Sequence, residues 1–383
     1  MERPSIATFF ADIPDPRVER TRRHDLVDVI VMSMLAVICG ANHWTEIVDF
    51  AETREEWLRI FLRLPSGIPG VDTFRRVFAV LDVEAFNRAF IEWTQSLTDT
   101  VKGKLVAIDG KTLRGLYTTS EKNDARHMVS AWVSENHIVF GQLATEAKSN
   151  EITAIPKLVK MLDLKGATVT IDAMGCQHKS VEAIVDKEAD YLIAVKDNQP
   201  KLREDVEVAF ATASLTNEKL PRTAKHESTE KAHGRHEVRR VLVLEAEDRL
   251  SEGQSWRALQ SLVWVESERT VKGKHSREDR YYISSVKPDA VVIAKLVRGH
   301  WGIENQQHWT LDMAFDEDRN RTRKKNGPDN FALLRRIALN LLKLETSTKR
   351  SIQRKRLVAG WDAQYLLRVL EAGAQQKVDP PAH

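Results

Sequence analysis

Hydrophobic residues in the first hundred positions recur at spacings of three and four, which is typical of helices that bury one side. One set with this spacing consists of Val83, Phe86, Phe90, Trp93 and Leu97. The longest strongly apolar stretch, 29–40, contains Ser33 and is too short to cross a bilayer. We therefore predict a buried helix at 29–40, a helical region at 1–100 and no membrane partner.

A tight turn at 65–70 precedes a short predicted helix, for which Asp72 is the expected N-cap. Arg75 and Arg76 lie near the start of this helix. A helix that follows a turn and begins with arginines is compatible with DNA recognition in a groove. A small helical bundle with solvated arginines explains the same residues, so both interpretations stay open.

From Lys104 onward, short apolar runs with the character of strands replace the helical spacing. The predicted order is three strands, a helix, a strand, a helix and a strand. Their ranges are 105–108, 128–133, 138–144, 151–162, 167–171, 180–187 and 191–195. Because strands and helices alternate after the first three strands, we predict a mixed α/β fold.

The pattern changes again at about 198–288, where an acidic helix precedes three β-like runs. These runs are 238–244, 261–267 and 280–285, and they predict a β-rich insertion. Helical spacing then returns. Residues 318–356 contain thirteen Lys or Arg and only three acids, so we expect this basic block to attract DNA without sequence preference.

Whole-chain composition excludes several classes of protein. The 383 residues are 42% hydrophobic and 30% charged, which fits about two folded domains and excludes wholesale disorder. The net charge of +3 identifies no partner. Cys39 and Cys176 lie far apart, which excludes a disulfide framework and a cysteine-built zinc site. They fit a reducing compartment, so we expect a cytoplasmic protein.

Two aspartates end predicted strands. Asp109 and Asp172 each follow an apolar run and precede a small residue, and open α/β sheets place their sites at strand ends. Neighbouring carboxylates repel each other unless a cation lies between them. The pair therefore predicts a divalent metal, with Mg²⁺ the expected ion. Two unrelated aspartates in turns would give the same pattern.

The segment 300–312 is rich in titratable groups. Four of them follow one another at intervals of four: His300, Glu304, His308 and Asp312. A helix would align them on one face, next to Trp301 and Trp309. Solvated faces favour Lys, Arg and Glu, whereas this face combines histidine with acids. A solvated polar face with the tryptophans as core anchors is the alternative.

Five blocks of this sequence resemble, in the same order, the signature blocks of the ISAs1-type insertion-sequence transposases. This group includes the H-repeat-associated proteins and is related to the IS4 group. The blocks are 108–111, 148–152, 171–177, 196–199 and 300–312. The resemblance covers nearly the whole chain and implies an α/β fold with a ribonuclease-H-like catalytic core. It places the Asp-Asp-Glu triad on Asp109, Asp172 and Glu304.

The resemblance also implies a division of the chain. We expect an N-terminal helical, transposase-associated domain at 1–100 that could bind DNA. The catalytic domain is expected at 101–345, with the β-rich insertion at about 198–288 inside it. A basic C-terminal segment and tail would occupy 346–383.

The activity implied by the resemblance is DNA transposition. Two Mg²⁺ ions, for which Mn²⁺ can substitute, would be held by the three acids and would drive in-line cleavage and strand transfer. The DNA partners are the terminal inverted repeats of the element and the target DNA. A homodimer is expected, because two DNA ends must be brought together. The expected location is the bacterial cytoplasm, in association with the nucleoid.

Several residues are expected to contact DNA or phosphate: Lys111, Lys148, Arg235, His300, His308, Arg319, Arg321 and Arg323. IS4-group transposases have Tyr, Arg and Lys at fixed offsets from the third acid, where this chain has Val297, His300 and Leu311. His300 and His308 are the expected substitutes. Solvated lysines and an exposed hairpin at 233–240 are the alternative interpretations of the basic residues outside 300–312.

Two other functions stay open. A catalytically inactive or domesticated DNA-binding protein derived from a transposase would keep the fold without cleaving DNA. A mononuclear zinc hydrolase would use His300, Glu304 and His308 as ligands, although their spacing is not His-Glu-x-x-His. Zinc binding without any need for Asp109 would favour the hydrolase.

Overall fold

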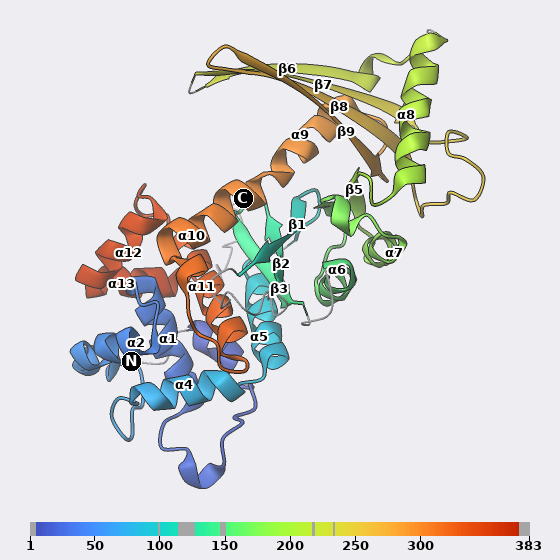
Figure 1. Ribbon diagram of the computed structural model, residues 1–383. Helices are drawn as coiled ribbons and strands as arrows, with labels where there is room; N and C mark the ends of the chain where they lie inside the picture. The colour runs from blue at the N-terminus through green and yellow to red at the C-terminus, as the bar shows by residue number, and fades with distance from the viewer. Residues whose placement is uncertain are drawn as a thin grey trace, which may run out of the picture.

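The computed structural model describes residues 5–98, 100–113, 127–145, 151–216, 219–232 and 234–374. It consists of a helical body and a long mixed sheet that extends away from it (Figure 1). The N-terminal helical elements are η1 (Ser5–Phe10), η2 (Glu19–Thr21), α1 (Leu26–Cys39), α2 (Trp44–Thr53), α3 (Glu55–Leu58), α4 (Val71–Val80) and α5 (Val83–Ser96).

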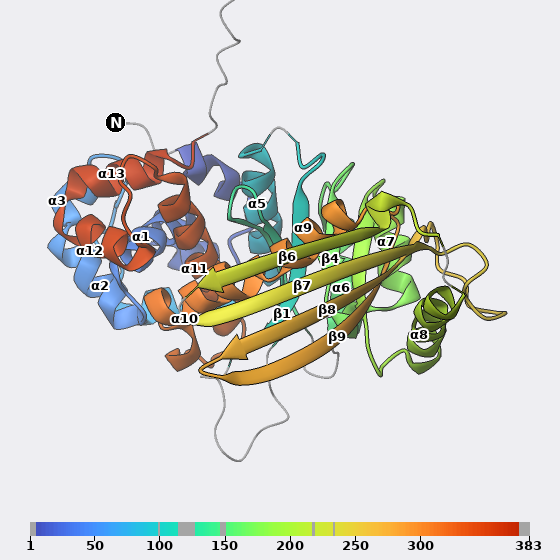
Figure 2. The same ribbon diagram turned by 90° about the horizontal axis from the view of Figure 1, so that it is seen from above.

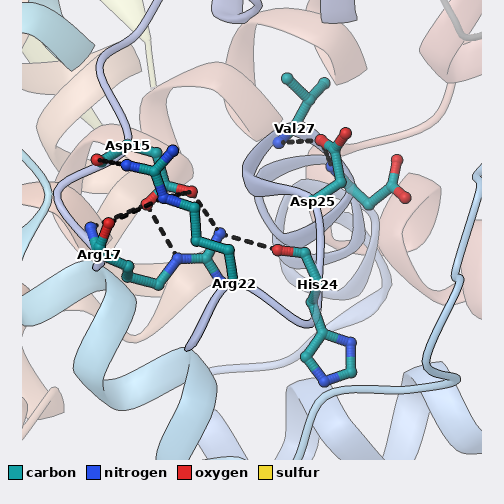
Figure 3. A network of polar contacts seen from close by, with 7 residues as sticks. Asp15, Arg17, Arg22, His24, Asp25 and Val27 are labelled. Carbon is teal, nitrogen blue, oxygen red and sulfur yellow. Dashed lines mark hydrogen bonds and ion pairs between the residues drawn. The ribbon is translucent and has the colours of Figure 1, made fainter. Parts of the chain in front are cut away.

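Helix α1 lies in the centre of the helical body, as its uniformly apolar sequence predicts. Its residues from Leu26 to Ile38 are all buried. Asp25 caps the helix by accepting a hydrogen bond of 2.9 Å from the Val27 amide. Upstream, Arg17 donates to the Asp15 carboxylate at 2.6 Å and to the His24 carbonyl at 2.8 Å, which fixes the entry to the helix (Figure 3).

Among the described residues, no single helix is long and apolar enough to cross a membrane. Helices α1 and α2 pass that test only as a pair, and the pair is bent by 95°.

Helix α4 differs from its prediction at the first turn. It begins at Val71 after Gly70, so Asp72 lies inside the first turn and is not the N-cap; its carboxylate accepts from Arg75 instead. Arg75 and Arg76 are exposed. The apolar side of the helix packs against α11 (Gly327–Leu344).

The two ends of the chain share one helical body. Helices α12 (Ile352–Trp361) and α13 (Ala363–Glu371) follow α11 and pack with it against α1 (Figure 1). Arg356 donates to the Val37 carbonyl at 2.8 Å, and the Trp93 indole donates to the Gly373 carbonyl at 3.0 Å. The helical region at 1–100 and the segment after 345 therefore bury their apolar sides against each other.

One sheet of nine strands, with the order β3-β2-β1-β4-β5-β9-β8-β7-β6, runs through the molecule. Its first five strands are β1 (Leu105–Thr112), β2 (His127–Val133), β3 (Ile138–Ala144), β4 (Thr168–Ile171) and β5 (Asp190–Val195). Strands β1, β4 and β5 are parallel, whereas β2 and β3 form an antiparallel extension. The predicted strand and helix order and the mixed α/β class are confirmed.

The inserted strands continue this sheet. They are β6 (Lys225–Ala232), β7 (Arg235–Glu245), β8 (Ser261–Val271) and β9 (Lys274–Ser284), with α8 (Pro200–Leu215) and η6 (Arg222–Ala224) before them. Strand β9 pairs antiparallel with β5, which makes the insertion part of the same sheet. Strand β6 was not predicted, because its sequence KHESTEKA has no alternation of apolar and polar residues.

Helices cover both faces of the sheet. Helices α6 (Glu151–Met161) and α7 (His178–Asp186) lie on one face, where Leu158 and Leu162 pack against Gly141. Helix α9 (Ala290–His300) crosses the other face and continues into the body (Figures 1 and 2). A Cβ at Gly302 would lie 2.5 Å from the Trp132 ring, so glycine permits the close approach of this helical segment to β2.

Candidate active site

Asp109 and Asp172 lie side by side where the parallel pairing of β1 with β4 ends. Ile108 of β1 is in register with Ile171 of β4, and each aspartate follows directly. Strand β1 itself continues along β2 to Thr112, so Asp109 lies inside the strand and not at the strand end that the sequence predicted. The Asp172 carboxylate accepts from the amides of Met174 at 3.1 Å and Gly175 at 3.4 Å, because it caps the short turn η5 (Ala173–Gly175). The structure thus brings the two predicted carboxylates to one edge of the sheet.

Glu304 lies on an irregular helical segment that faces this edge. The π-helix η7 (Ile303–His308) carries Glu304 in its first turn and is followed by α10 (Trp309–Phe315). Single π-turns inside helices are frequent at functional sites. The Glu304 side chain is exposed, whereas the neighbouring Ile303 and Gln307 are buried. The three acids of the predicted triad therefore come from β1, from the end of β4 and from η7.

Two histidines, at the start and end of the segment that carries Glu304, face the sheet. His300 Nδ1 is 2.9 Å from the Thr170 hydroxyl on β4. His308 Nδ1 is 3.6 Å from Asp109 Oδ2 on β1. Burial lowers the pKa of His300 to about 4 and that of His308 to about 3, so both rings are neutral at pH 7. The His300 ring faces β4 and the His308 ring faces β1. This arrangement does not support a zinc site built from both rings and Glu304.

The electrostatics of Asp109 show that the acids act on one another. Burial, together with the charges of Asp172, Glu304 and Glu151, raises the pKa of Asp109 to about 8 against the opposing effect of the hydrogen bond from the Gly110 amide. Burial also raises the pKa of Asp172. The hydrogen bonds from the Gly175 and Met174 amides and the charge of Lys196 partly offset this rise. Carboxylates so placed are costly to ionise unless a cation neutralises them.

Glu151 is a fourth acid at this edge, and sequence reasoning assigned it no role. It begins α6, and a Cβ on Gly110 would lie 2.0 Å from its Oε1 atom. Burial raises its pKa, as does Asp172. The sequence feature that could have identified Glu151 is its position inside the block 148–152, which follows β3.

Lys111 faces inward, toward the helices behind the site. Its ammonium group contacts the Asp312 carboxylate and lies 3.2 Å from Glu317 Oε2. Burial raises the pKa of Glu317, but Arg336 and Lys111 outweigh that effect and hold it at about 2. This buried network ties β1 to α10 and α11, with Arg336 paired to the same carboxylate.

The remaining predicted contact residues are dispersed. Arg235 is half-exposed on β7, and Arg319, Arg321 and Arg323 are exposed in the connection before α11. Lys148 lies outside the described residues. The positions that correspond to the IS4-group Tyr and Lys, Val297 and Leu311, are buried apolar residues.

The basic block 318–356, which we expected to attract DNA, lies only partly at the surface. Four of its cations are buried: Arg335, Arg336, Lys355 and Arg356. Lys355 donates to the Leu342 carbonyl at 2.8 Å, and Arg335 and Arg356 lie over the rings of Phe331 and Phe315. These side chains join helices to one another, and counting charges along the sequence cannot distinguish them from surface cations.

The acids at the sheet edge suit a hard divalent cation by donor type and by charge. Carboxylate oxygens are preferred ligands of Mg²⁺ and Mn²⁺, and a cation would relieve the repulsion that raises the pKa of Asp109. Within the described ranges, no three His, Cys, Asp or Glu side chains already form a ready-made metal site. Binding would therefore require the carboxylates to turn toward a common point.

Two family models match consecutive parts of the chain. The model described as "DDE_Tnp_1-associated" matches residues 7–94. The model described as "Transposase DDE domain" matches residues 101–341, more than half of the chain.

Curated relatives match over nearly the full length. The chain is 40% identical over 370 residues to "Putative transposase YncI" of Escherichia coli O157:H7, which covers 96% of this chain and 94% of the relative. It is 37% identical over 375 residues to "H repeat-associated putative transposase YhhI" of Escherichia coli K12, with 97% and 98% covered. A shorter match of 77 residues, 35% identical, is to "Inactive transposase YbfQ" of the same strain and covers 20% of this chain and 92% of the relative.

Proposed function

Since this chain belongs to the transposase family defined by the DDE domain, we propose that it cleaves DNA at the ends of its own insertion sequence and joins those ends to a target. The observation that carries the proposal is the proximity of Asp109, Asp172 and Glu304 at one edge of the sheet. There, burial together with Asp172 and Glu304 raises the pKa of Asp109. Family membership alone would not identify these side chains.

We further propose that strands β1 to β5 with α6, α7 and α9 form a ribonuclease-H-like core. Three features support it: the antiparallel extension β2–β3, the parallel central strands and the two aspartates at the point where the pairing of β1 with β4 ends. The core would occupy the catalytic domain at 101–345, after a helical domain at 1–100.

The chain's own residues would prepare the phosphoryl transfer. Asp109 lies inside β1 and Asp172 directly after β4, and Glu304 approaches from the helical side, so the scissile phosphate would bind between sheet and helix. Neutral His308 lies 3.6 Å from the Asp109 carboxyl group and adds no charge beside it. Lys111 pairs with Asp312 and Glu317 and so holds β1 against α10. Two Mg²⁺ ions would activate the attacking oxygen and stabilise the leaving oxygen of an in-line displacement.

DNA is the proposed partner, through the terminal repeats of the element and the target. Exposed Arg319, Arg321 and Arg323, half-exposed Arg235 and the exposed arginines of α4 would contribute to contact with the DNA backbone. A homodimer on DNA is proposed because two ends must be cut and joined together. The site of action would be the nucleoid of a bacterial cytoplasm.

A second candidate function is a catalytically inactive, domesticated DNA-binding protein. The specific observation that favours it is the similarity to a relative named as an inactive transposase. That match covers only 20% of this chain, whereas all three acids are present here.

The test is cleavage of DNA that carries both flanks of the encoding gene, with Mg²⁺ or Mn²⁺. We compare the wild-type chain with Glu304→Ala and Asp172→Ala. The proposal expects specific cuts at the flanks by the wild type and loss of cutting, with DNA binding retained, in both variants. Binding without cleavage by any of the proteins would favour the inactive DNA-binding protein. Cleavage that persists in Glu304→Ala would place the third acid elsewhere.

A further inference from the structure

The two faces of the inserted sheet β6–β9 differ in their balance of charge. Successive side chains of a strand point to opposite faces. On β7, Val241 and Val243 pack with Ile293 and Val297 of α9, so the odd-numbered residues of β7 lie on the face turned toward α9. The strand register then assigns the residues of β6, β8 and β9 to one face or the other.

On the α9 face, three arginines share a single carboxylate. Glu237 is almost fully buried, and its carboxylate oxygens lie 2.5 Å from Arg239, 3.6 Å from Arg235 and 3.6 Å from Arg269. Arg235 and Arg269 remain half-exposed. One carboxylate neutralises one guanidinium group, so this cluster keeps an excess of positive charge.

The cluster continues into a groove that reaches the helical segment carrying Glu304. The groove has a volume of about 360 Å³ and ends at Asn305 and Gln306, which follow Glu304 in the sequence. Its charged lining consists of Arg235, Arg239, Arg269, Arg280, Arg298, Glu230, Glu237 and Glu278. Arg280 also lies over the Trp301 ring at 4.6 Å, which holds one wall of the groove in place.

The opposite face has no such excess of positive charge. Arg240, the neighbour of Arg239 in the sequence, is surrounded by Glu227 at 2.8 Å, Glu266 at 2.7 Å and Glu268 at 2.9 Å. Arg277 pairs with Glu266 at 2.6 Å and lies 3.5 Å from Asp279. The strand register also places Lys225 and Lys231 on this face, so four cations balance its four acids and it offers a polyanion no net attraction.

We propose that the α9 face of β6–β9 binds the phosphate backbone of the DNA strand that is cut, and that the opposite face stays free of DNA. This inference rests on the proposed function. The arginines around Glu237 bind successive phosphates, because guanidinium groups bind phosphate oxygens in pairs and the shared carboxylate leaves them undersaturated. The groove then guides the strand past Trp301 toward the segment that carries Glu304, and the difference in net charge between the two faces sets the side of the sheet that the DNA approaches.

The experiment measures DNA binding in EDTA, so catalysis plays no part. Fluorescence anisotropy follows a labelled duplex with one flank of the encoding gene, from about 50 to 300 mM salt. The test variant is Arg239→Gln/Arg269→Gln, and its matched control is Arg240→Gln/Arg277→Gln, which removes the same charge from the same sheet on the other face. Glu237→Gln is a third variant, and circular dichroism with thermal unfolding verifies that each protein is folded.

The inference predicts at least tenfold weaker binding for Arg239→Gln/Arg269→Gln and a salt dependence reduced by about one to two released counterions. The control stays within about twofold of the wild type. Glu237→Gln binds DNA several-fold more tightly, a gain that misfolding cannot produce. Equal losses in the two double variants, or no gain in Glu237→Gln, would overturn the inference and leave the proposed function standing. A wild type that does not bind DNA even at low salt would overturn both.

Discussion

Asp109 is the site residue whose ionisation most reduces the stability of the folded protein. Its carboxyl group is buried next to Asp172 and has a pKa raised to about 8. The folded protein therefore binds this proton more tightly than the unfolded chain, whose aspartates titrate near 3.8. The contribution of this carboxyl group to the free energy of unfolding is fully present below about pH 4. It is lost as the pH rises toward 8, because the unfolded chain releases the proton first.

Replacing Asp109 with Asn is therefore expected to stabilise the metal-free protein at alkaline pH. Each pH unit over which only the folded carboxyl group stays protonated corresponds to about 1.4 kcal/mol, so a gain of at least about 2 kcal/mol is expected at pH 8.5. Calorimetric unfolding in EDTA at pH 8.5 and pH 4.5 measures it. A gain of equal size at both pH values would show that the Asp109 charge is not responsible.

Individual site residues could be predicted from the sequence to different degrees. The sequence predicts the pairing of Asp109 with Asp172 because each directly follows an apolar run, and parallel neighbours bring the ends of such runs together. The continuation of β1 past Asp109 to Thr112 was not predicted, since 109–112 is mostly polar. Glu304 required the resemblance to a family, since its surroundings alone left a polar helix face as an alternative. The inward direction of Lys111 depends on Glu317, about two hundred positions away, which no local pattern reveals.

At the scale of the element, η7 departs most from its predicted form. Intervals of four from His300 to Asp312 predict an uninterrupted α-helix with four residues on one face. The π-turn separates them, so that Glu304 is exposed while His308 and Asp312 reach β1. An extra residue per turn changes the direction of side chains, and hydrophobic spacing does not signal it.

Deletion of Asn305 tests the role of this turn. Removing one exposed residue from the π-helix should restore α-helical spacing and rotate Glu304 away from Asp109. We expect DNA cleavage to fall at least 100-fold, while thermal unfolding and DNA binding change little. Asn305→Ala, which keeps the length of the turn, is the control. Retained cleavage in the deletion variant would mean that the turn does not position Glu304.

At the scale of the whole molecule, the helical ends of the chain depend on each other. The sequence predicted helices at 1–100 from their spacing, but it gave no sign that α12 and α13 complete their core. Tyr365, Leu366, Val369 and Leu370 are buried, and Arg356 is bonded to α1. Contacts between segments more than 300 positions apart are set by tertiary packing and leave no periodic signal.

Truncation after residue 345 should therefore disrupt the body that contains α1. Losing α12 and α13 exposes the apolar side of α1, and we expect aggregation or a loss of cooperative unfolding. Thermal unfolding followed by circular dichroism measures this, with a chain that lacks only 375–383 as the control. A cooperative transition at the wild-type temperature in the 1–345 chain would contradict the mutual dependence.

The central claim is that Asp109, Asp172 and Glu304 hold divalent metal together, and direct Mn²⁺ titration tests it most simply. Isothermal calorimetry at pH 7.5 would compare the wild type with Asp109→Asn, Asp172→Asn and Glu304→Gln, each verified as folded. We predict binding by the wild type and at least tenfold weaker binding by every variant, because each loses one carboxylate ligand. Wild-type affinity in any of the three variants, or a wild type that binds no Mn²⁺, would contradict the account.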